Sequence, residues 1–277
     1  MRTLLNLGTS LLIGLAPPGA GAANPDGCGP LDDPQQLART ARIVLVGEMH
    51  GTREFPALAA RLACQALDAG RPATLALEIP LEEDARLAAY MASDGKAQAA
   101  AALAQGSAFW HKVRDGRSSG AMLELIEQAR RWRAAGKPVQ VVAIDKPRSA
   151  PGTRDEHMAA RVRQASLDKP ESLVIALTGN MHNRLAPFEA KDMSMKIDTP
   201  MGVLLRDLAP VSIASERTRG AFFACMPDCR VHSFEGDGPA LAVPRIVAAP
   251  RRDGMAYTHF VDLGYTSASL PAVEAVD

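Results

Sequence analysis

Ionisable side chains follow four separate apolar runs of this 277-residue chain. Glu48 and His50 come after the first run, Glu78 after the second, Asp145 after the third and His182 after the fourth. Histidine is a general base near neutral pH, and a neighbouring carboxylate fixes its tautomer or raises its basicity. Such a pair activates water for attack on an ester, lactone or amide carbonyl. We therefore predict a catalytic site made of Glu48, His50, Glu78 and His182.

The spacing of the first pair supports this prediction. Glu48 and His50 are two residues apart on an extended segment, so their side chains project to the same side. The glycines that flank them allow the backbone to come close to a ligand. Two histidines with one or two carboxylates also suit zinc or manganese, with His50, Glu78 and His182 as the ligands. A divalent metal is thus a second use of the same residues.

The four apolar runs have the composition of fully buried strands. They span Arg42 to Val46, Thr74 to Leu77, Val139 to Ile144 and Ser172 to Leu177. Helical patterns follow the first and third runs, at Phe55 to Ala69 and at Asp155 to Leu167. This alternation predicts a mostly parallel sheet flanked by helices, a three-layer α/β/α fold. Ligands bind outside the carboxyl ends of such strands, where the ionisable side chains would gather.

Two segments depart from this alternation of strands and helices. Residues 81–137 are too many for one crossover helix. We interpret them as a helical insertion of two or three helices, split by a loop at 106–120, of the kind that forms a lid over a site. Beyond Pro210, the runs Val211 to Ala214, Ala221 to Ala224 and His259 to Leu263 predict further edge strands, which we expect to be antiparallel.

Asp145 and Arg154 are candidate substrate-binding residues. Arg154 lies at the start of the helix after the third strand, and that helix N-terminus should face the crevice and offer positive potential to an anion or oxyanion. Asp145 has an alternative role, because it could pair with Lys146 or cap a turn.

The segment Gly116-Arg117-Ser118-Ser119-Gly120 matches the G-x-S-x-G pattern of α/β-hydrolases. A nucleophile elbow needs a buried strand immediately before the serine, and residues 110–115 are too polar to form one. We therefore expect Ser118 or Ser119 to cap the helix that contains Met122 to Trp132.

The composition limits the class of partner. With 47% hydrophobic and 22% charged residues, the chain can bury one substantial core. Its 31 basic residues balance 31 acidic ones, and no Lys/Arg cluster is interleaved with aromatic residues. We expect no nucleic-acid partner. A small-molecule substrate or haem is the expected ligand, and the oligomeric state stays open.

The N-terminus has the pattern of a secretory signal. Arg2, the apolar stretch Leu4 to Leu15 and the Ala20-Gly21-Ala22 cleavage pattern predict a signal peptide over residues 1–22. Residues 23–277 would then form a single periplasmic or secreted domain. The apolar stretch is too short for a membrane span, and no later segment is long enough. We expect no lipid anchor at Cys28, because residues 24–27 separate it from the apolar stretch.

Four cysteines, an even number in a chain expected to be exported, predict disulfides. Cys225 and Cys229 could close a small turn, which would leave Cys28 with Cys64. Three connectivities are possible. A metal site at Cys225 and Cys229 is a weaker option, because no second pair of ligands lies nearby in the sequence.

Several of these segments together resemble a known superfamily. The matching residues are Gly47-Glu48-Met49-His50, Glu78, Gly179-Asn180-Met181-His182 and the segment Arg154 to Ala159. They resemble the motif set of the superfamily that contains erythromycin esterases, Tiki and TraB proteins, and ChaN-like haem-binding proteins. The resemblance covers Ala41 to Leu208 and is closest to ChaN-like chains. It implies an α/β sandwich with a helical insertion and a shared Glu/His site.

Function differs within that superfamily. The resemblance implies metal-free water activation by histidine for the esterases, metal-dependent proteolysis for Tiki proteins and haem binding for ChaN-like proteins. Our leading hypothesis is a hydrolase in which His50, oriented by Glu48 or Glu78, activates water, with His182 as second base, acid or metal ligand. The alternative is a non-catalytic haem or iron carrier, although Tyr90, Tyr257 and Tyr265 do not match a haem-ligand context. A third hypothesis is a catalytically silent binding domain.

Overall fold

The computed structural model describes residues 28–190, 195–215, 218–225, 227–238, 241–250 and 253–273. The predicted signal peptide, residues 1–22, lies outside these ranges. A seven-stranded sheet has the order β10-β11-β7-β1-β4-β2-β3. Its strands are β1 (Ile43–Glu48), β2 (Ala73–Pro80), β3 (Val139–Asp145), β4 (Leu173–Gly179), β7 (Val211–Ser215), β10 (Arg245–Ala248) and β11 (His259–Asp262).

The sheet is parallel except at one edge. The four strands predicted from apolar runs are β1 to β4, and they pair parallel in the order β1-β4-β2-β3. The expectation that later strands are antiparallel is wrong for two of them, because β7 pairs parallel with β1 and β11 pairs parallel with β7. Only β10 is antiparallel to its neighbour in this sheet. Strand β10 runs in the opposite direction and returns the chain to the edge of the sheet where the parallel strands begin, before β11 starts. An apolar run in the sequence does not indicate this reversal.

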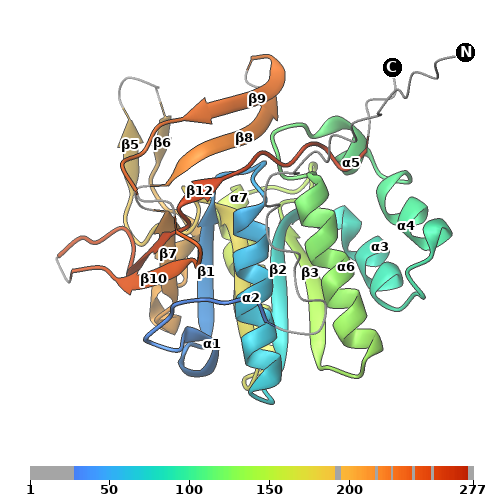
Figure 1. Ribbon diagram of the computed structural model, residues 1–277, viewed down its shortest axis with the longest axis horizontal. Helices are drawn as coiled ribbons and strands as arrows, with labels where there is room; N and C mark the ends of the chain where they lie inside the picture. The colour runs from blue at the N-terminus through green and yellow to red at the C-terminus, as the bar shows by residue number, and fades with distance from the viewer. Residues whose placement is uncertain are drawn as a thin grey trace, which may run out of the picture.

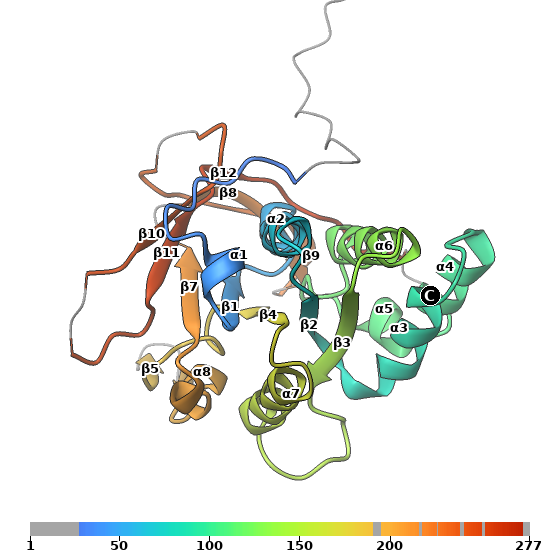
Figure 2. The ribbon, with the colours of Figure 1, turned by 90° about the horizontal axis from the view of Figure 1, so that it is seen from below.

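Helices cover both faces of the sheet, which confirms the predicted three layers. Helices α2 (Glu54–Asp68) and α6 (Gly120–Ala134) lie on one face, and α7 (Arg154–Asp168) and α8 (Met201–Leu204) lie on the other (Figure 2). Alternate residues of β1 divide between the layers. Val44 and Val46 belong to the core under α2, whereas Ile43 and Leu45 pack with α7. Burial on both faces explains why the strands are continuous apolar runs.

Several short helices connect β2 to β3 within the predicted insertion. They are η1 (Leu81–Glu83), α3 (Asp84–Met91), α4 (Ala97–Ala104) and α5 (Ala108–Lys112), followed by α6. The expected loop at 106–120 contains α5, because Phe109 and Trp110 are buried there. Ser119 caps α6 through a hydrogen bond from the Met122 amide, while Ser118 donates to the carbonyl of Val113. The capping interpretation of this segment is therefore confirmed.

A smaller sheet lies beyond the carboxyl ends of the central strands (Figure 1). It consists of β12 (Tyr265–Thr266), β8 (Arg219–Cys225) and β9 (Cys229–Phe234). The run Ala221 to Ala224 thus lies in a strand of a separate sheet, antiparallel to β9 and parallel to β12. The remaining short elements are the hairpin of β5 (Phe188–Ala190) and β6 (Met195–Ile197), with α1 (Leu37–Thr40) before β1 and η3 (Arg206–Leu208) before β7.

The segment 267–272 fastens the loop after β1 to the start of α6. The Ser269 amide donates to the carbonyl of Gly51 at 2.7 Å, and the Ser267 hydroxyl donates to Glu54 at 2.6 Å. On the other side, the Gly120 amide donates to the carbonyl of Leu270 at 2.8 Å. We call residues 267–272 the brace segment.

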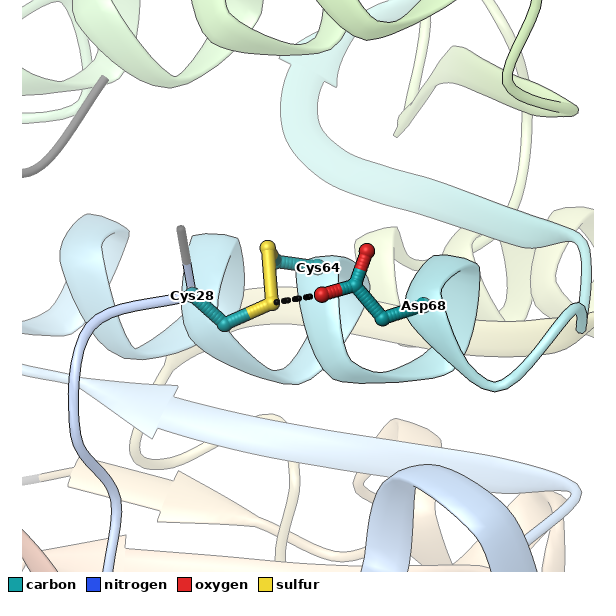
Figure 3. A group of neighbouring side chains, drawn as sticks. All are labelled: Cys28, Cys64 and Asp68. Carbon is teal, nitrogen blue, oxygen red and sulfur yellow. Dashed lines mark hydrogen bonds between the residues drawn. A yellow bond between two sulfur atoms is a disulfide. The ribbon is translucent and has the colours of Figure 1, made fainter. Parts of the chain in front are cut away.

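Of the three possible disulfide connectivities, the structure has Cys28–Cys64 and Cys225–Cys229. The first bond ties the segment before α1 to α2, and the second closes the turn between β8 and β9. Figure 3 shows Cys28, Cys64 and Asp68 side by side. These three residues form the one group of His, Cys, Asp or Glu ligands within metal-binding distance in the described part of the chain. A disulfide provides no thiolate, so this group is not a metal site.

Two disulfides fit an extracellular or periplasmic protein. Among the described residues, no helix has the length and apolar character needed to cross a membrane.

Candidate active site

Two imidazoles and one buried carboxylate form the centre of the site. His50 Nδ1 lies 2.8 Å from Oε1 of Glu48, the last residue of β1. His50 Nε2 lies 3.5 Å from Oε2 of Glu78, near the end of β2. His182, in the turn after β4, places its Nε2 4.0 Å from Oε1 of Glu78. Because β4 lies between β1 and β2, the fold brings all four predicted residues to one sheet edge.

His182 has a carboxylate partner of its own. Its Nδ1 lies 2.9 Å from Oδ1 of Asp155, and the same oxygen accepts a hydrogen bond from the Met201 amide at 2.7 Å. Asp155 is the second residue of α7 and is buried. Each imidazole therefore has Nδ1 fixed by one carboxylate and Nε2 directed toward Glu78.

Glycine at position 179 allows the strands and the histidine ring to approach this closely. The Gly179 amide donates to Oε2 of Glu78 at 2.7 Å. A Cβ at this position would lie 3.0 Å from His50 Nε2, so a side chain would displace the ring. Gly51, just after His50, has a φ of 76° and packs against the backbone of Phe223 in β8. Gly179 and Gly51 are thus each required by a close contact.

Two arginines hold the acidic side chains behind the imidazoles. Arg154 donates to Oε1 of Glu78 and to both oxygens of Asp145, the latter at 2.8 Å. Arg117 donates to Asp145 at 2.8 Å, lies 3.5 Å from Glu78, and pairs with Asp115. Asp145 and Arg154, predicted as substrate-binding residues, therefore contact each other and support Glu78. A substrate-binding role for them stays a prediction.

Charges surrounding the ring determine the protonation of His50. Burial alone would lower the pKa of His50, but Glu78 and Glu48 outweigh burial and raise the pKa to about 10. Burial opposes ionisation of Glu78, whereas His50, His182 and Arg154 hold the pKa of Glu78 well below its usual range. At neutral pH, His50 is an imidazolium and Glu78 is a carboxylate.

Sequence reasoning misses three residues of this site. Asp115 and Arg117 belong to the segment between α5 and α6. In that segment the sequence indicates a role only for Ser118 and Ser119. The sequence indicates that Asp155 belongs to the acidic first turn of a helix. Its position next to Arg154 is the one sequence feature that also indicates a side chain facing the crevice. Its contact with His182 joins residues 27 positions apart.

The arrangement does not fit a divalent cation at His50, Glu78 and His182. Oε1 of Glu78 accepts from Arg154 and lies near Arg117, and Oε2 accepts from the Gly179 amide. A metal ion would have to displace these donors beside two guanidinium charges. Among the described residues, only the ligand atoms of the Cys28 group all lie within metal-binding distance of one another. Those of His50, Glu78 and His182 do not.

Haem iron fits these residues no better. An axial histidine must turn Nε2 toward the iron, but the Nε2 atoms of His50 and His182 face Glu78. The hydroxyl of Tyr257 donates to the Asn180 carbonyl, and that of Tyr90 donates to Glu127. A porphyrin face is apolar, whereas this edge of the sheet is crowded with carboxylates and guanidinium groups.

Solved structures show which known proteins share this fold. The erythromycin esterase EreC, in an open conformation, has a TM-score of 0.59 and 13% identity, over 87% of this chain and 95% of the esterase. A succinoglycan biosynthesis protein has a TM-score of 0.57 and 12% identity, over 85% of this chain and 91% of its own. A Bacillus cereus protein has a TM-score of 0.53 and 12% identity, over 86% and 91%. The fold is therefore the one that the resemblance to the superfamily containing erythromycin esterases and ChaN-like proteins implies.

No protein-family model matches the chain. No curated protein matches it by sequence either.

Proposed function

We propose that this protein is a hydrolase that activates water against an ester, lactone or amide. One observation carries the proposal: two imidazoles, each with Nδ1 bound to its own carboxylate, direct Nε2 toward the same buried glutamate. The esterase fold is compatible with the proposal but, at 13% identity, does not decide it.

The surroundings of the two rings favour His182 as the base. Asp155 accepts a hydrogen bond from Nδ1 of His182, so Nε2 carries the lone pair when the ring is neutral. His50 carries a proton at neutral pH, because two carboxylates raise its pKa to about 10. The hypothesis from sequence gave the base role to His50. We now assign that role to His182 and make His50 the positively charged partner.

With these roles, the proposed reaction has the following steps. His182 Nε2 takes a proton from water while the hydroxide adds to the carbonyl carbon. The His50 imidazolium stabilises the negative charge that forms on the carbonyl oxygen. When the tetrahedral intermediate collapses, the leaving oxygen or nitrogen takes the proton from His182. Glu48 and Glu78 hold His50 in its charged form throughout.

Substitution of either histidine tests the proposal. We expect His182→Ala and His50→Ala each to lower turnover of an activated ester by about 100-fold or more, because each removes a proton-transfer or charge-stabilising group. His111→Ala is the control, since its ring contacts the carbonyl of Gln105 outside the site. Circular dichroism and thermal melting establish that the variants fold. Normal turnover in a folded His182→Ala or His50→Ala protein contradicts the proposal.

A haem or iron carrier is the alternative that the resemblance to ChaN-like proteins implies, although both Nε2 atoms face Glu78 and not an open ligand position. Haemin titration of the wild type, His50→Ala and His182→Ala discriminates the two functions in the visible spectrum. A saturable Soret shift near one equivalent that disappears in either variant would support the carrier. No shift would leave the hydrolase as the function to pursue with ester, lactone and peptide substrates.

A further inference from the structure

Arg184 lies two residues beyond His182, and its guanidinium contacts two aromatic rings. Its guanidinium carbon is 4.9 Å from the ring centre of Phe188 and 5.3 Å from that of Tyr257. Its Nη1 donates to the Tyr257 hydroxyl at 3.1 Å. Aromatic faces attract a cation without neutralising it, so these contacts fix the position of a full positive charge.

Hydrogen bonds tie this arginine to the loop that carries the site. The Tyr257 hydroxyl donates to the carbonyl of Asn180 at 2.8 Å. The Asn180 amide in turn donates to the carbonyl of Glu48 at 3.1 Å, at the end of β1. The positive charge of Arg184 is therefore fixed relative to the backbone that presents Glu48 and His182.

Arg184 differs from the other arginines of this region in its lack of a counter-charge. Arg117 and Arg154 are paired with carboxylates. Arg184 forms no ion pair with any residue in the described ranges. Its Nε is buried and has no hydrogen-bond partner there, and Nη2 makes none either. A half-buried, unpaired guanidinium is unfavourable for stability alone, because desolvated charges and unbonded donors both cost free energy.

We propose that Arg184 binds a carboxylate on the substrate, next to the carbonyl group that is hydrolysed. This inference rests on the proposed hydrolase function and narrows its substrates to esters, lactones or amides that carry an anionic group. The planar guanidinium matches a carboxylate, and Nη2 makes no hydrogen bond within the described ranges, so its donors remain for the ligand. Arg184 is then a specificity-determining residue.

A pair of activated esters measures this specificity. Mono-p-nitrophenyl glutarate carries a free carboxylate, and p-nitrophenyl butyrate is neutral. We expect Arg184→Gln to lower kcat/KM for the glutarate ester by about 10-fold or more through a higher KM, with kcat/KM for the butyrate unchanged. Arg184→Lys should recover part of the loss. Arg39→Gln removes the same charge from an exposed position in α1 and should affect neither ester. Equal losses on both esters, or no loss, overturn the proposal.

A binding measurement separates failure of this inference from failure of the hydrolase. If the wild type hydrolyses neither ester, the hydrolase proposal fails, and calorimetric titration with monomethyl glutarate then tests Arg184 directly. Binding to the wild type that is lost in Arg184→Gln supports a carboxylate site. Equal binding to both proteins, no binding to the wild type, or tighter binding of inorganic phosphate than of monomethyl glutarate overturns it.

Discussion

His50 lies between two carboxylates, and this position decides what the ring can do. Glu48 is at Nδ1 and Glu78 is at Nε2, so both nitrogens face acceptors and the doubly protonated ring is favoured. Glu78 is buried with 1% of its side chain exposed, and solvent screens the pair weakly. A residue that looks like a general base in the sequence is a fixed cation in the structure.

This charge predicts how stability depends on pH. The pKa of His50 is about 10 in the folded protein and about 6.5 in an unfolded chain. The folded state therefore holds the proton more tightly. The resulting stabilisation is fully present below about pH 6.5 and is lost as the pH rises through about 10. Urea unfolding at pH 7, 8.5 and 10 should show a larger fall in unfolding free energy for the wild type than for His50→Gln. Parallel profiles would show that the ring is not charged.

The limits of sequence reasoning at the residue scale are clearest in Asp155 and Arg117. Glu48, His50, Glu78 and His182 are predictable because each follows an apolar run that must be a strand. The contact of His182 with Asp155 depends on where α7 crosses the sheet, and the contacts of Arg117 depend on how the segment before α6 folds back. Neither has a periodic pattern in the sequence.

At the scale of elements, the start of α7 positions half of the site. Thr153 and Glu156 form a capping box, in which the Thr153 hydroxyl accepts from the Glu156 amide and Glu156 accepts from the Thr153 amide. Arg154 and Asp155 lie between these two residues in the sequence. Arg154 contacts Glu78, and Asp155 contacts His182. The cap thus fixes the first turn of the helix at the place where both side chains are needed.

Removing this cap should lower both stability and activity. We expect Thr153→Ala to reduce the unfolding free energy by about 1 kcal/mol. Turnover should fall several-fold as well, because a frayed first turn lets Asp155 move away from His182. Thr153→Ser keeps the hydroxyl and serves as the matched control. Chemical denaturation and ester hydrolysis measure the two effects. A loss of stability with full activity would mean that Asp155 is held by its Met201 contact alone.

The elements themselves were only partly predictable. Strands β1 to β4 and helices α2 and α7 follow from continuous apolar runs and capping signals. The direction of β7 and β11 could not be predicted, because an apolar run indicates a strand but not whether it pairs parallel or antiparallel. Helix α5 lies among glycines and polar residues, is capped by Ser107, and buries Phe109 and Trp110 in the core.

At the scale of the whole molecule, the two disulfides should contribute unequally. Cys28–Cys64 closes a loop with a sequence separation of 36, and Cys225–Cys229 one of 4. In the chain-entropy description, a longer loop restricts the unfolded state more. We expect Cys28→Ala with Cys64→Ala to lower stability by about 3 kcal/mol and the other double variant by less. Denaturant unfolding of the two double variants measures the two losses of unfolding free energy. A larger loss without Cys225–Cys229 would contradict the prediction and would show that this bond stabilises the native hairpin directly.

The brace segment has a consequence for when the candidate site can form during synthesis. Glu48 and His50 are translated early, but the serines that fasten their loop to α6 are residues 267 and 269. The neighbours of β1 in the sheet, β4 and β7, also emerge later from the ribosome. Such long-range contacts form slowly and late. A nascent chain therefore carries the side chains of the candidate site long before that site can form, and the proposed hydrolytic activity would require residues 267–272 to be available for folding.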